Sequence, residues 1–215
     1  MSCFVKRLLA ITESSDIVFS KYEVYSTAQS LYCYPDTNVL RNHLHITEHA
    51  ELKAAEEEIT ALKQYALLQN PIRGRFTKTH LCRIHRFLFS DIYPFAGRFR
   101  REQIAKADTW FYPPTMIDQE LQKICELIQQ EHYWNKAADD VFIDRLAFVM
   151  AELNIIHPFR EGNGRTIREF IRELALYNGI VLNWGNVDRE AVLRTAIDSV
   201  DDYTALIPLL EHCIE

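Results

Sequence analysis

Apolar residues recur at helical spacing along most of this chain. From Thr47 to Asn70 they fall at every third or fourth position beside a run of glutamates, and Pro71 ends the pattern. Similar periodic stretches predict helices that begin at Thr77 and at Thr115, because a threonine hydroxyl can cap the first turn of a helix. Thr47 is likewise expected to cap the first of the three helices.

The most apolar stretch, Asp140–Ile156, predicts a helix at the centre of the fold. Asn163–Tyr177 predicts the next helix, which Gly179 would close. Two more helices are expected near Asp188–Ser199 and Asp202–Cys213. The fold class that follows is mostly α.

One segment departs from helical spacing. After Gly97 the chain alternates through Phe99 and Ile104 and then reaches the aromatic run Trp110–Tyr112, which two prolines follow. This pattern predicts a β-hairpin or an exposed loop. The first 30 residues have no clear period, so we expect an N-terminal arm over residues 1–33 and one domain over residues 34–215.

Composition narrows the class of protein. The 215 residues carry a formal net charge of −6, whereas a surface that follows nucleic-acid phosphates is basic. We therefore expect no direct binding of nucleic acid. The longest apolar run, Leu146–Ala151, is far shorter than the roughly 20 residues that span a bilayer. No secretory leader is evident, so we expect a cytoplasmic protein, with export by a route without such a leader left open.

Candidate chemistry is concentrated between residues 157 and 168. Pro158 ends the apolar helix, and Gly162 and Gly164 allow the backbone to turn so that successive N–H groups point the same way at the start of the next helix. Such a turn binds anions. Arg165 and Arg168 lie one helical turn apart, so both can reach a polyphosphate at the positive end of that helix.

The remaining polar residues of this segment complete a possible reaction site. His157 has a side chain suited to accepting a proton near neutral pH. Glu161 is the single carboxylate among the anion-binding groups, and a divalent cation, Mg²⁺, would reconcile it with phosphate. Phe159 is expected to anchor the loop in the core. A purely structural interpretation, in which a helix stop precedes an ordinary turn, explains each piece alone but not their combination in nine contiguous residues.

At these residues the sequence resembles the Fic family, whose signature H-x-F-x-[DE]-G-N-G-R-x-x-R is met at every defined position. The resemblance extends over residues 34–213. It implies a helical bundle with a β-hairpin flap over the site, and an enzyme that transfers AMP from ATP to a tyrosine, threonine or serine hydroxyl of a target protein. By this resemblance the base is His157, the Mg²⁺ ligand is Glu161, and the phosphate-binding residues are Gly162, Asn163, Gly164, Arg165 and Arg168.

The resemblance also implies how a target would bind. In this family an extended target segment adds to the flap as a strand; here the flap would span about Gln103 to Tyr112. Its target-docking residues would be Lys106, Trp110 and Phe111. Phe111 or Trp110 would either clamp the target side chain or seal the hairpin against the domain.

The self-inhibitory motif that many members of this family carry is incomplete in this sequence. Family members that inhibit themselves carry [ST]-x-x-x-E-[GN], and here the one partial match is Thr47 with Glu51, followed by Leu52. The chain therefore resembles the toxin-like class in which a separate antitoxin supplies the inhibitory helix. Relatives of that class modify subunits of gyrase and topoisomerase IV, and secreted relatives modify host GTPases.

Two alternatives to AMP transfer stay open at this point. A related enzyme could use another donor, because some members of the family transfer UMP, phosphocholine or phosphate. A catalytically vestigial module could instead bind nucleotide without chemistry, although binding alone would not require His157. The chain is also its own candidate acceptor, so self-modification is a prediction.

Overall fold

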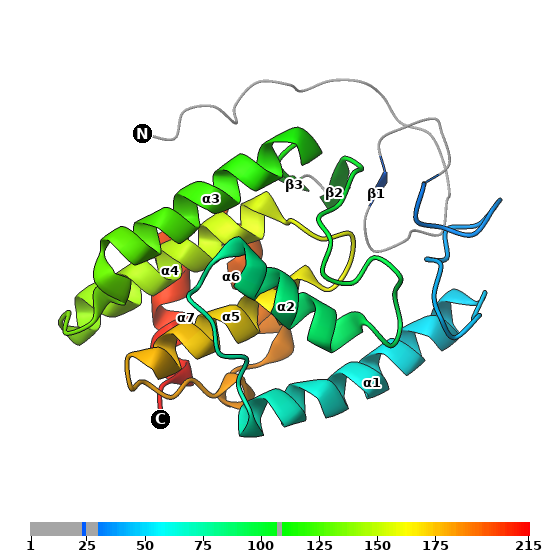
Figure 1. Cartoon of the computed structure of the whole chain (residues 1–215). Helices are drawn as coiled ribbons and strands as arrows, with labels where there is room; N and C mark the ends of the chain where they lie inside the picture. The colour runs from blue at the N-terminus through cyan, green and yellow to red at the C-terminus, as the bar shows by residue number, and fades with distance from the viewer. Residues whose placement is uncertain (1–22, 25–29, 107–108) are drawn as a thin grey trace.

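The computed structural model describes residues 23–24, 30–106 and 109–215. In this part of the chain the helical periodicity is confirmed, and seven α-helices form the domain (Figure 1). The helices are α1 His49–Gln69, α2 Lys78–Phe89, α3 Pro114–Gln130, α4 Asp139–Ile156, α5 Asn163–Tyr177, α6 Arg189–Asp198 and α7 Leu206–Cys213, with short 3₁₀ turns at His132–Trp134, Trp184–Asn186 and Tyr203–Ala205.

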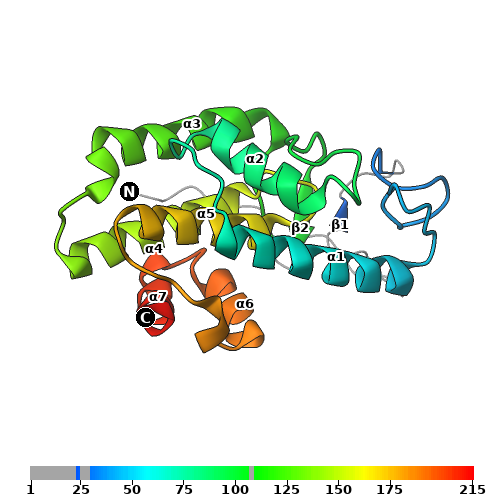
Figure 2. The ribbon, with the colours of Figure 1, turned by 60° about the horizontal axis from the view of Figure 1, so that its bottom comes forward.

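Helices α4 and α5 form the centre of the bundle. Helix α4 packs on α3, α5 and α7, and α5 packs on α2, which in turn contacts α1. Figure 2 shows α2 and α3 on one side of this central pair and α6 and α7 on the other. Leu146, Val149 and Ile156 of α4 are fully buried, as expected of the central and most apolar helix.

Two of the three predicted N-terminal caps are wrong. Thr77 does cap α2, but the residue before α1 is Glu48 rather than Thr47, and its side chain makes no capping hydrogen bond. Helix α3 begins at Pro114, one residue before Thr115. Proline is well suited to a first helical position because its φ is already helical and its missing N–H would have no partner there.

The end of α5 agrees with the sequence-based expectation. Gly179 has φ +80°. Its N–H donates to Leu176 O at 3.0 Å, and the N–H of Ile180 donates to Ala175 O at 3.0 Å. These two bonds satisfy the last carbonyls of the helix in the pattern that favours a left-handed glycine.

The predicted hairpin is present between α2 and α3. Strands β2 Ile104–Lys106 and β3 Thr109–Trp110 pair antiparallel, and we call them the flap. A third strand, β1 Glu23–Val24, pairs antiparallel with the other edge of β2, which the sequence analysis did not predict. The expected arm otherwise lies mostly outside the described residues, and the division at residue 34 stays a prediction.

None of the helices in the described residues is both long and apolar enough to cross a membrane. Most of the large apolar side chains are instead gathered in one core that all the long helices share. The carboxyl end of α4 and the amino end of α5 meet beside the flap (Figure 1). The segment between them is the one that carries the candidate chemistry.

Candidate active site

The segment His157–Gly164, which we call the anion loop, connects α4 to α5. His157 ends α4 in a left-handed conformation with φ 47°. Arg100, buried at the base of the flap, binds the loop twice: its backbone N–H donates to Pro158 O at 2.8 Å and its Nε donates to His157 O at 2.8 Å. The same guanidinium also donates to the backbone carbonyl of Tyr112. One arginine therefore joins both ends of the flap to the loop.

The imidazole of His157 is held in a defined orientation. Its Nδ1 lies 2.9 Å from the backbone carbonyl of Asn154, and since a carbonyl only accepts, Nδ1 must carry the proton. In the neutral ring the basic atom is then Nε2. The ring also stacks on Phe111, with centroids 3.7 Å apart and planes 13° apart. His157 is thus oriented to accept a proton at Nε2.

The turn of the anion loop is closed by Asn163. Its Oδ1 accepts the backbone N–H of Phe159 at 2.8 Å, and its Nδ2 donates to the carbonyl of Phe159 at 2.7 Å. Both residues have no exposed surface, so the expected core position of Phe159 is observed. The side chain of Asn163 shapes the loop, while its backbone N–H lies in the first turn of α5, where N–H groups lack helical partners.

Gly162 packs the loop directly against α2. It has φ +79°, and a Cβ built on it would lie 2.2 Å from the ring of Phe89. No other residue meets both conditions, because a left-handed φ disfavours a side chain and the ring occupies the space. At Gly164 a Cβ would lie 3.3 Å from Nη1 of Arg168. The glycines therefore let α2 and Arg168 approach the loop backbone.

His85 of α2 makes contacts with the loop that the sequence pattern does not predict. It is fully buried, its Nδ1 accepts the N–H of Gly97 at 2.7 Å, and its Nε2 lies 2.9 Å from the carbonyl of Glu161. The first contact requires an unprotonated Nδ1 and the second a protonated Nε2, so the ring is neutral. Burial lowers the pKa of His85 to about 4. Its ring stacks on Phe159, with centroids 3.9 Å apart.

Arg168 is the cation best placed for an anionic ligand. Burial, followed by the nearby charges of Arg165 and Arg189, lowers its pKa to about 10. Its guanidinium has no carboxylate within ion-pair distance among the described residues. A buried positive charge without a partner is costly, and a bound phosphate would remove that cost.

Arg165 is already paired. Its Nη2 forms an ion pair with Glu56 of α1, and its Nη1 donates to Thr60 Oγ1 at 2.9 Å. Burial alone would lower the pKa of Arg165, but Glu56 outweighs it and the pKa is raised. Glu56 is only 8% exposed, so this member of the glutamate run on α1 is buried with Arg165 rather than solvated. The structure brings Arg165 to α1, and its expected contact with the outer phosphates stays a prediction.

Glu161 provides the single carboxylate of the anion loop. It is buried, its Oε1 accepts the N–H of Gly162 at 2.9 Å, and it lies 3.9 Å from Nη2 of Arg165. The described residues contain no group of three or more His, Cys, Asp or Glu that could hold a metal ion. One carboxylate fits Mg²⁺ nevertheless, because this ion commonly combines one or two carboxylates with substrate phosphates and water.

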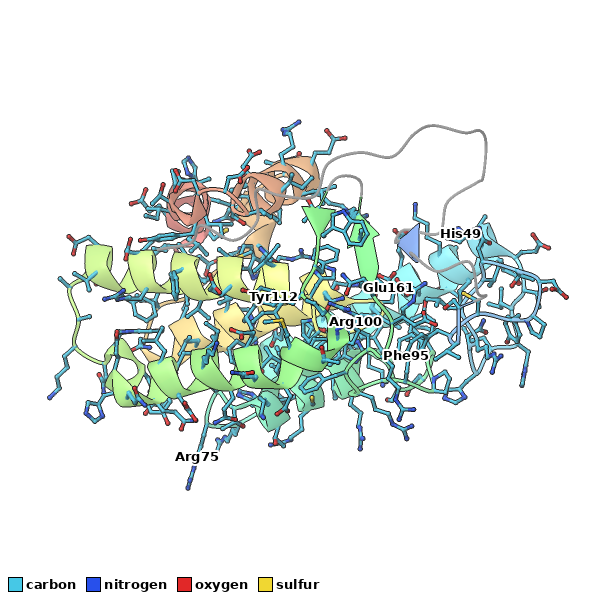
Figure 3. All side chains as sticks on the ribbon, turned by 90° about the horizontal axis from the view of Figure 1, so that it is seen from above. His49, Arg75, Phe95, Arg100, Tyr112 and Glu161 are labelled. Carbon is cyan, nitrogen blue, oxygen red and sulfur yellow. The ribbon has the colours of Figure 1, made fainter. Side chains whose placement is uncertain are left out.

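The flap residues differ in exposure. Phe111 is 7% exposed and covers His157, whereas Trp110 is 50% exposed. The burial of Phe111 is consistent with the expected sealing of the hairpin against the domain, and a contact of Phe111 or Trp110 with a target side chain stays a prediction. Lys106 ends β2, and the neighbouring positions Ala107 and Asp108 lie outside the described residues. Figure 3 shows Arg100 and Glu161 near the strands, while Arg75 extends from another side of the molecule.

Three side chains that shape the site were absent from the sequence-based expectation: His85, Arg100 and Glu56. All three are buried polar or charged groups. Their partners in and beside the anion loop lie 56 to 109 residues later in the chain. The sequence signal that could have found His85 is its place on the apolar face of α2, together with Leu81, Ile84 and Leu88.

Known proteins identify the class of this site. Residues 75–175 match the model of the Fic/DOC family. The probable protein adenylyltransferase Fic of Salmonella typhimurium is 38% identical over 157 residues, which cover 73% of this chain and 77% of that protein. The chain therefore belongs to the Fic/DOC family.

Two further similar proteins, one matched by sequence and one by structure, agree with this assignment. The protein adenylyltransferase VbhT of Bartonella schoenbuchensis is 35% identical over 175 residues, 81% of this chain, although this match spans only 37% of VbhT. The crystal structure of BepC from Bartonella tribocorum, which contains bound AMPPNP, superimposes with a TM-score of 0.78 at 21% identity and covers 86% of this chain and 96% of BepC. That likeness establishes the Fic fold.

Proposed function

We propose that this chain is a protein adenylyltransferase that moves AMP from ATP to a hydroxyl side chain of a target protein. Several relatives that are 32–38% identical to it over aligned segments of 157–176 residues are named protein adenylyltransferases or probable ones. The observation that carries the proposal is that the oriented base His157 precedes the turn of the anion loop, while Arg168, a partly buried cation with no carboxylate partner among the described residues, follows that turn in α5.

The chemistry requires one proton transfer and one displacement at phosphorus. Nε2 of His157 accepts the proton of the target hydroxyl, and the hydroxyl oxygen attacks the α-phosphorus. A new P–O bond forms while the bond to the bridging oxygen between the α- and β-phosphates breaks, so pyrophosphate leaves. Phe111 and the carbonyl of Asn154 keep the imidazole in the orientation that this transfer needs.

The anion loop would bind the triphosphate. Backbone N–H groups at Gly162, Asn163 and Gly164 lie at the amino end of α5, where the helix dipole favours negative charge. The N–H of Gly162 donates to Oε1 of Glu161 and would exchange that acceptor for phosphate. Arg168 would contact a phosphate directly, and Arg165 would add positive charge from its place beside Glu56. Mg²⁺ bound at Glu161 would neutralise charge on the leaving pyrophosphate.

The target would dock on the flap. An extended segment that pairs with a strand is positioned by main-chain hydrogen bonds, so its hydroxyl is delivered at a defined distance from the base. Lys106 and Trp110 would contact such a segment. Trp110 is accessible for this contact, because half of its side chain is exposed. Candidate targets are those of the toxin-like and secreted relatives: subunits of gyrase and topoisomerase IV, or host GTPases. A separate antitoxin would supply the inhibitory helix.

The test is transfer of label from ATP marked at its α-phosphate, with Mg²⁺ and a bacterial lysate, followed by intact-mass measurement of the labelled band and of the chain itself. We expect AMP on a target and on the chain. His157→Ala should abolish it, and Arg168→Ala should weaken ATP binding as well. His212→Ala, an exposed histidine of α7, is the matched control.

Other donors separate the alternatives. ATP marked at its γ-phosphate, UTP marked at its α-phosphate and labelled CDP-choline each report a different transferred group. Label from one of these donors but none from α-marked ATP would replace the proposed donor. A biological effect that survives His157→Ala would support the vestigial binding module instead.

A further inference from the structure

The flap edge that faces away from β3 is already paired within this chain. Strand β1 lies antiparallel to β2, with Glu23 opposite Ala105 and Val24 opposite Ile104. Strand β2 therefore has a neighbour on each side in the order β1–β2–β3. A further strand can pair with β2 only if one of these two neighbours leaves, because each strand edge has one row of hydrogen-bonding groups.

The chain that follows β1 is fastened at the base of β2. The hydroxyl of Ser30 donates to Oε2 of Glu102 at 2.8 Å, and the backbone N–H of Leu31 donates to the other oxygen of that carboxylate. Glu102 also lies 3.8 Å from Nε of Arg160 in the anion loop. The root of β1 is therefore joined to the flap and to the loop by the same carboxylate.

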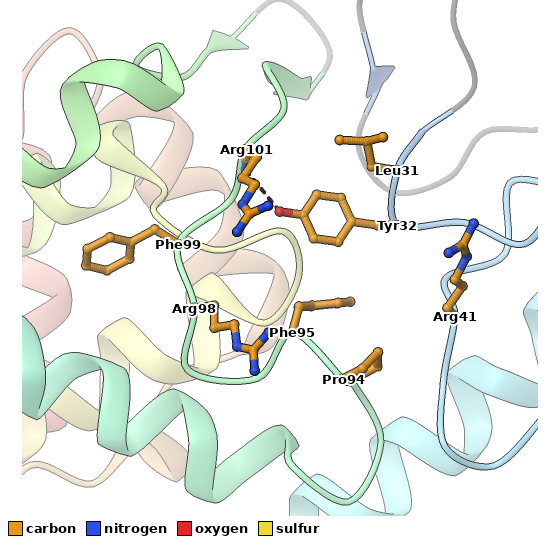
Figure 4. Close-up of a pocket in the computed structure, with 8 residues that line it drawn as sticks. All are labelled: Leu31, Tyr32, Arg41, Pro94, Phe95, Arg98, Phe99 and Arg101. Carbon is orange, nitrogen blue, oxygen red and sulfur yellow. Dashed lines mark hydrogen bonds between the residues drawn. The ribbon is translucent and has the colours of Figure 1, made fainter.

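Tyr32 adds a second attachment at this place. Its hydroxyl accepts the backbone N–H of Arg101 at 2.9 Å, which Figure 4 shows across a pocket. Its ring meets Phe95 edge to face, with centroids 5.2 Å apart. Burial raises the pKa of Tyr32, so the hydroxyl stays neutral at physiological pH. Both attachments hold the root of β1 two or three residues before β2 begins.

A short tether gives β1 a strong advantage over any strand from another molecule. Only residues 25–29 separate β1 from the attached Ser30. Linkers of that length produce effective concentrations on the order of millimolar. A target segment that is present at micromolar concentration must therefore bind much more tightly than β1 to take its place.

We propose that the β2 edge is the strand-docking surface of the flap and that β1 is its resident occupant, which a target segment must displace. The proposal rests on the proposed function, since it concerns how that site admits its target. The anion loop is linked to this edge, because Glu102 at the base of β2 lies 3.8 Å from Nε of Arg160 in the loop and also accepts hydrogen bonds from Ser30 and Leu31, which follow β1. The partner that fits this edge is an extended peptide segment that leaves its backbone N–H and C=O groups unpaired.

Hydrogen exchange on the full chain tests whether β1 protects β2. In an antiparallel pair alternate residues direct their N–H groups to the partner, so replacing both Glu23 and Val24 by proline removes the bond whichever residue makes it. We expect those amides of Ile104–Lys106 that point towards β1 to exchange about ten-fold faster in this variant, the effect of one lost hydrogen bond, while those that point towards β3 stay unchanged. Threonine at both positions keeps the N–H groups and is the matched control.

A peptide tests whether the vacated edge accepts a strand. A fluorescent peptide with the sequence of residues 19–29 should bind the double-proline variant at least about ten-fold more tightly than the unmodified chain. The same peptide with prolines at the two positions should bind neither protein. Equal exchange of β2 in both proteins, or equal peptide binding, would overturn the proposal.

Transfer of AMP supplies the last readout. If β1 competes with targets, the double-proline variant should label lysate proteins faster than the unmodified chain at the same ATP concentration. A β2 strand that exchanges faster while labelling stays unchanged would refute the competition. Absence of labelling in every variant would overturn the proposed function alone, because exchange and peptide binding are measured without ATP and do not need His157.

Discussion

The anion loop and the flap border the same site but are held in different ways. Backbone groups of the loop are bonded to the buried side chains of His85, Arg100 and Asn163. The flap consists of strands of two and three residues, and its outer edge is completed by β1 from the other end of the domain. The loop is thus part of the core, whereas the flap depends on a neighbour that can be exchanged.

This difference separates two requirements of the proposed reaction. Phosphates and the base must be held in one geometry, which buried hydrogen bonds achieve because they are costly to break. A protein target must arrive and leave, which a short, partly exposed sheet edge permits. Substitutions in the loop should therefore reduce the stability of the fold, and substitutions in the flap should mainly change how targets are recognised.

The largest effect on stability is expected at Gly162. Its replacement by alanine combines a left-handed φ with a methyl group 2.2 Å from the ring of Phe89, and we expect a loss of about 4 kcal/mol in the free energy of unfolding. Gly179→Ala is the matched control, because φ is +80° there but nothing lies within 4 Å; it should cost only about 1 kcal/mol. Urea denaturation measures both, and equal losses would contradict the close packing inferred here.

Replacement of the two signature arginines, Arg165 and Arg168, should have different effects on the free energy of unfolding. Arg165→Met leaves Glu56 buried without its partner and should lower the free energy of unfolding by about 3 kcal/mol. Arg168→Met removes a partly buried cation that has no carboxylate partner among the described residues, so stability should stay the same or rise. Thermal denaturation without nucleotide shows the contrast. Addition of ATP should stabilise the unmodified protein but not Arg168→Met.

His85 predicts how stability depends on pH. Its pKa is about 4 in the folded protein and about 6.5 in an unfolded chain. The folded state therefore binds the proton less well, so the stabilisation is complete above pH 6.5 and is lost as pH falls towards 4. The loss should amount to about 3 kcal/mol over this interval.

Carboxyl groups also titrate in this interval, so the effect of His85 is read as a difference between variants. Unfolding free energies of the unmodified protein and of His85→Gln are compared from pH 7 to pH 4. The gap between them should narrow as pH falls, because only the unmodified protein carries the buried imidazole. His212→Gln, at an exposed position, should run parallel to the unmodified protein. A constant gap for His85→Gln would contradict the lowered pKa.

The two regions also differ in how far their sequence predicts them. The anion loop is specified by neighbours in the chain: Pro158 stops one helix, and Gly162 permits the turn that begins the next. His85, Arg100 and Glu56 could not be assigned in this way, because their roles arise only when distant helices pack together. Strand β1 is too short to show an alternating pattern, so its pairing with β2 depends on tertiary structure as well.

The smallest effect is expected on the outer face of the flap. Trp110→Ala should change the free energy of unfolding by less than about 0.5 kcal/mol, because the ring is half exposed. Phe111→Ala, one residue further on, should cost about 3 kcal/mol, because that ring is buried against His157. In the AMP-transfer assay Trp110→Ala should raise KM for a protein target and leave self-labelling of the chain unchanged. Phe111→Ala should lower kcat, because it removes the ring that orients His157. An equally large fall in kcat for Trp110→Ala would place Trp110 among the groups that orient the base. The flap would then not serve target recognition alone.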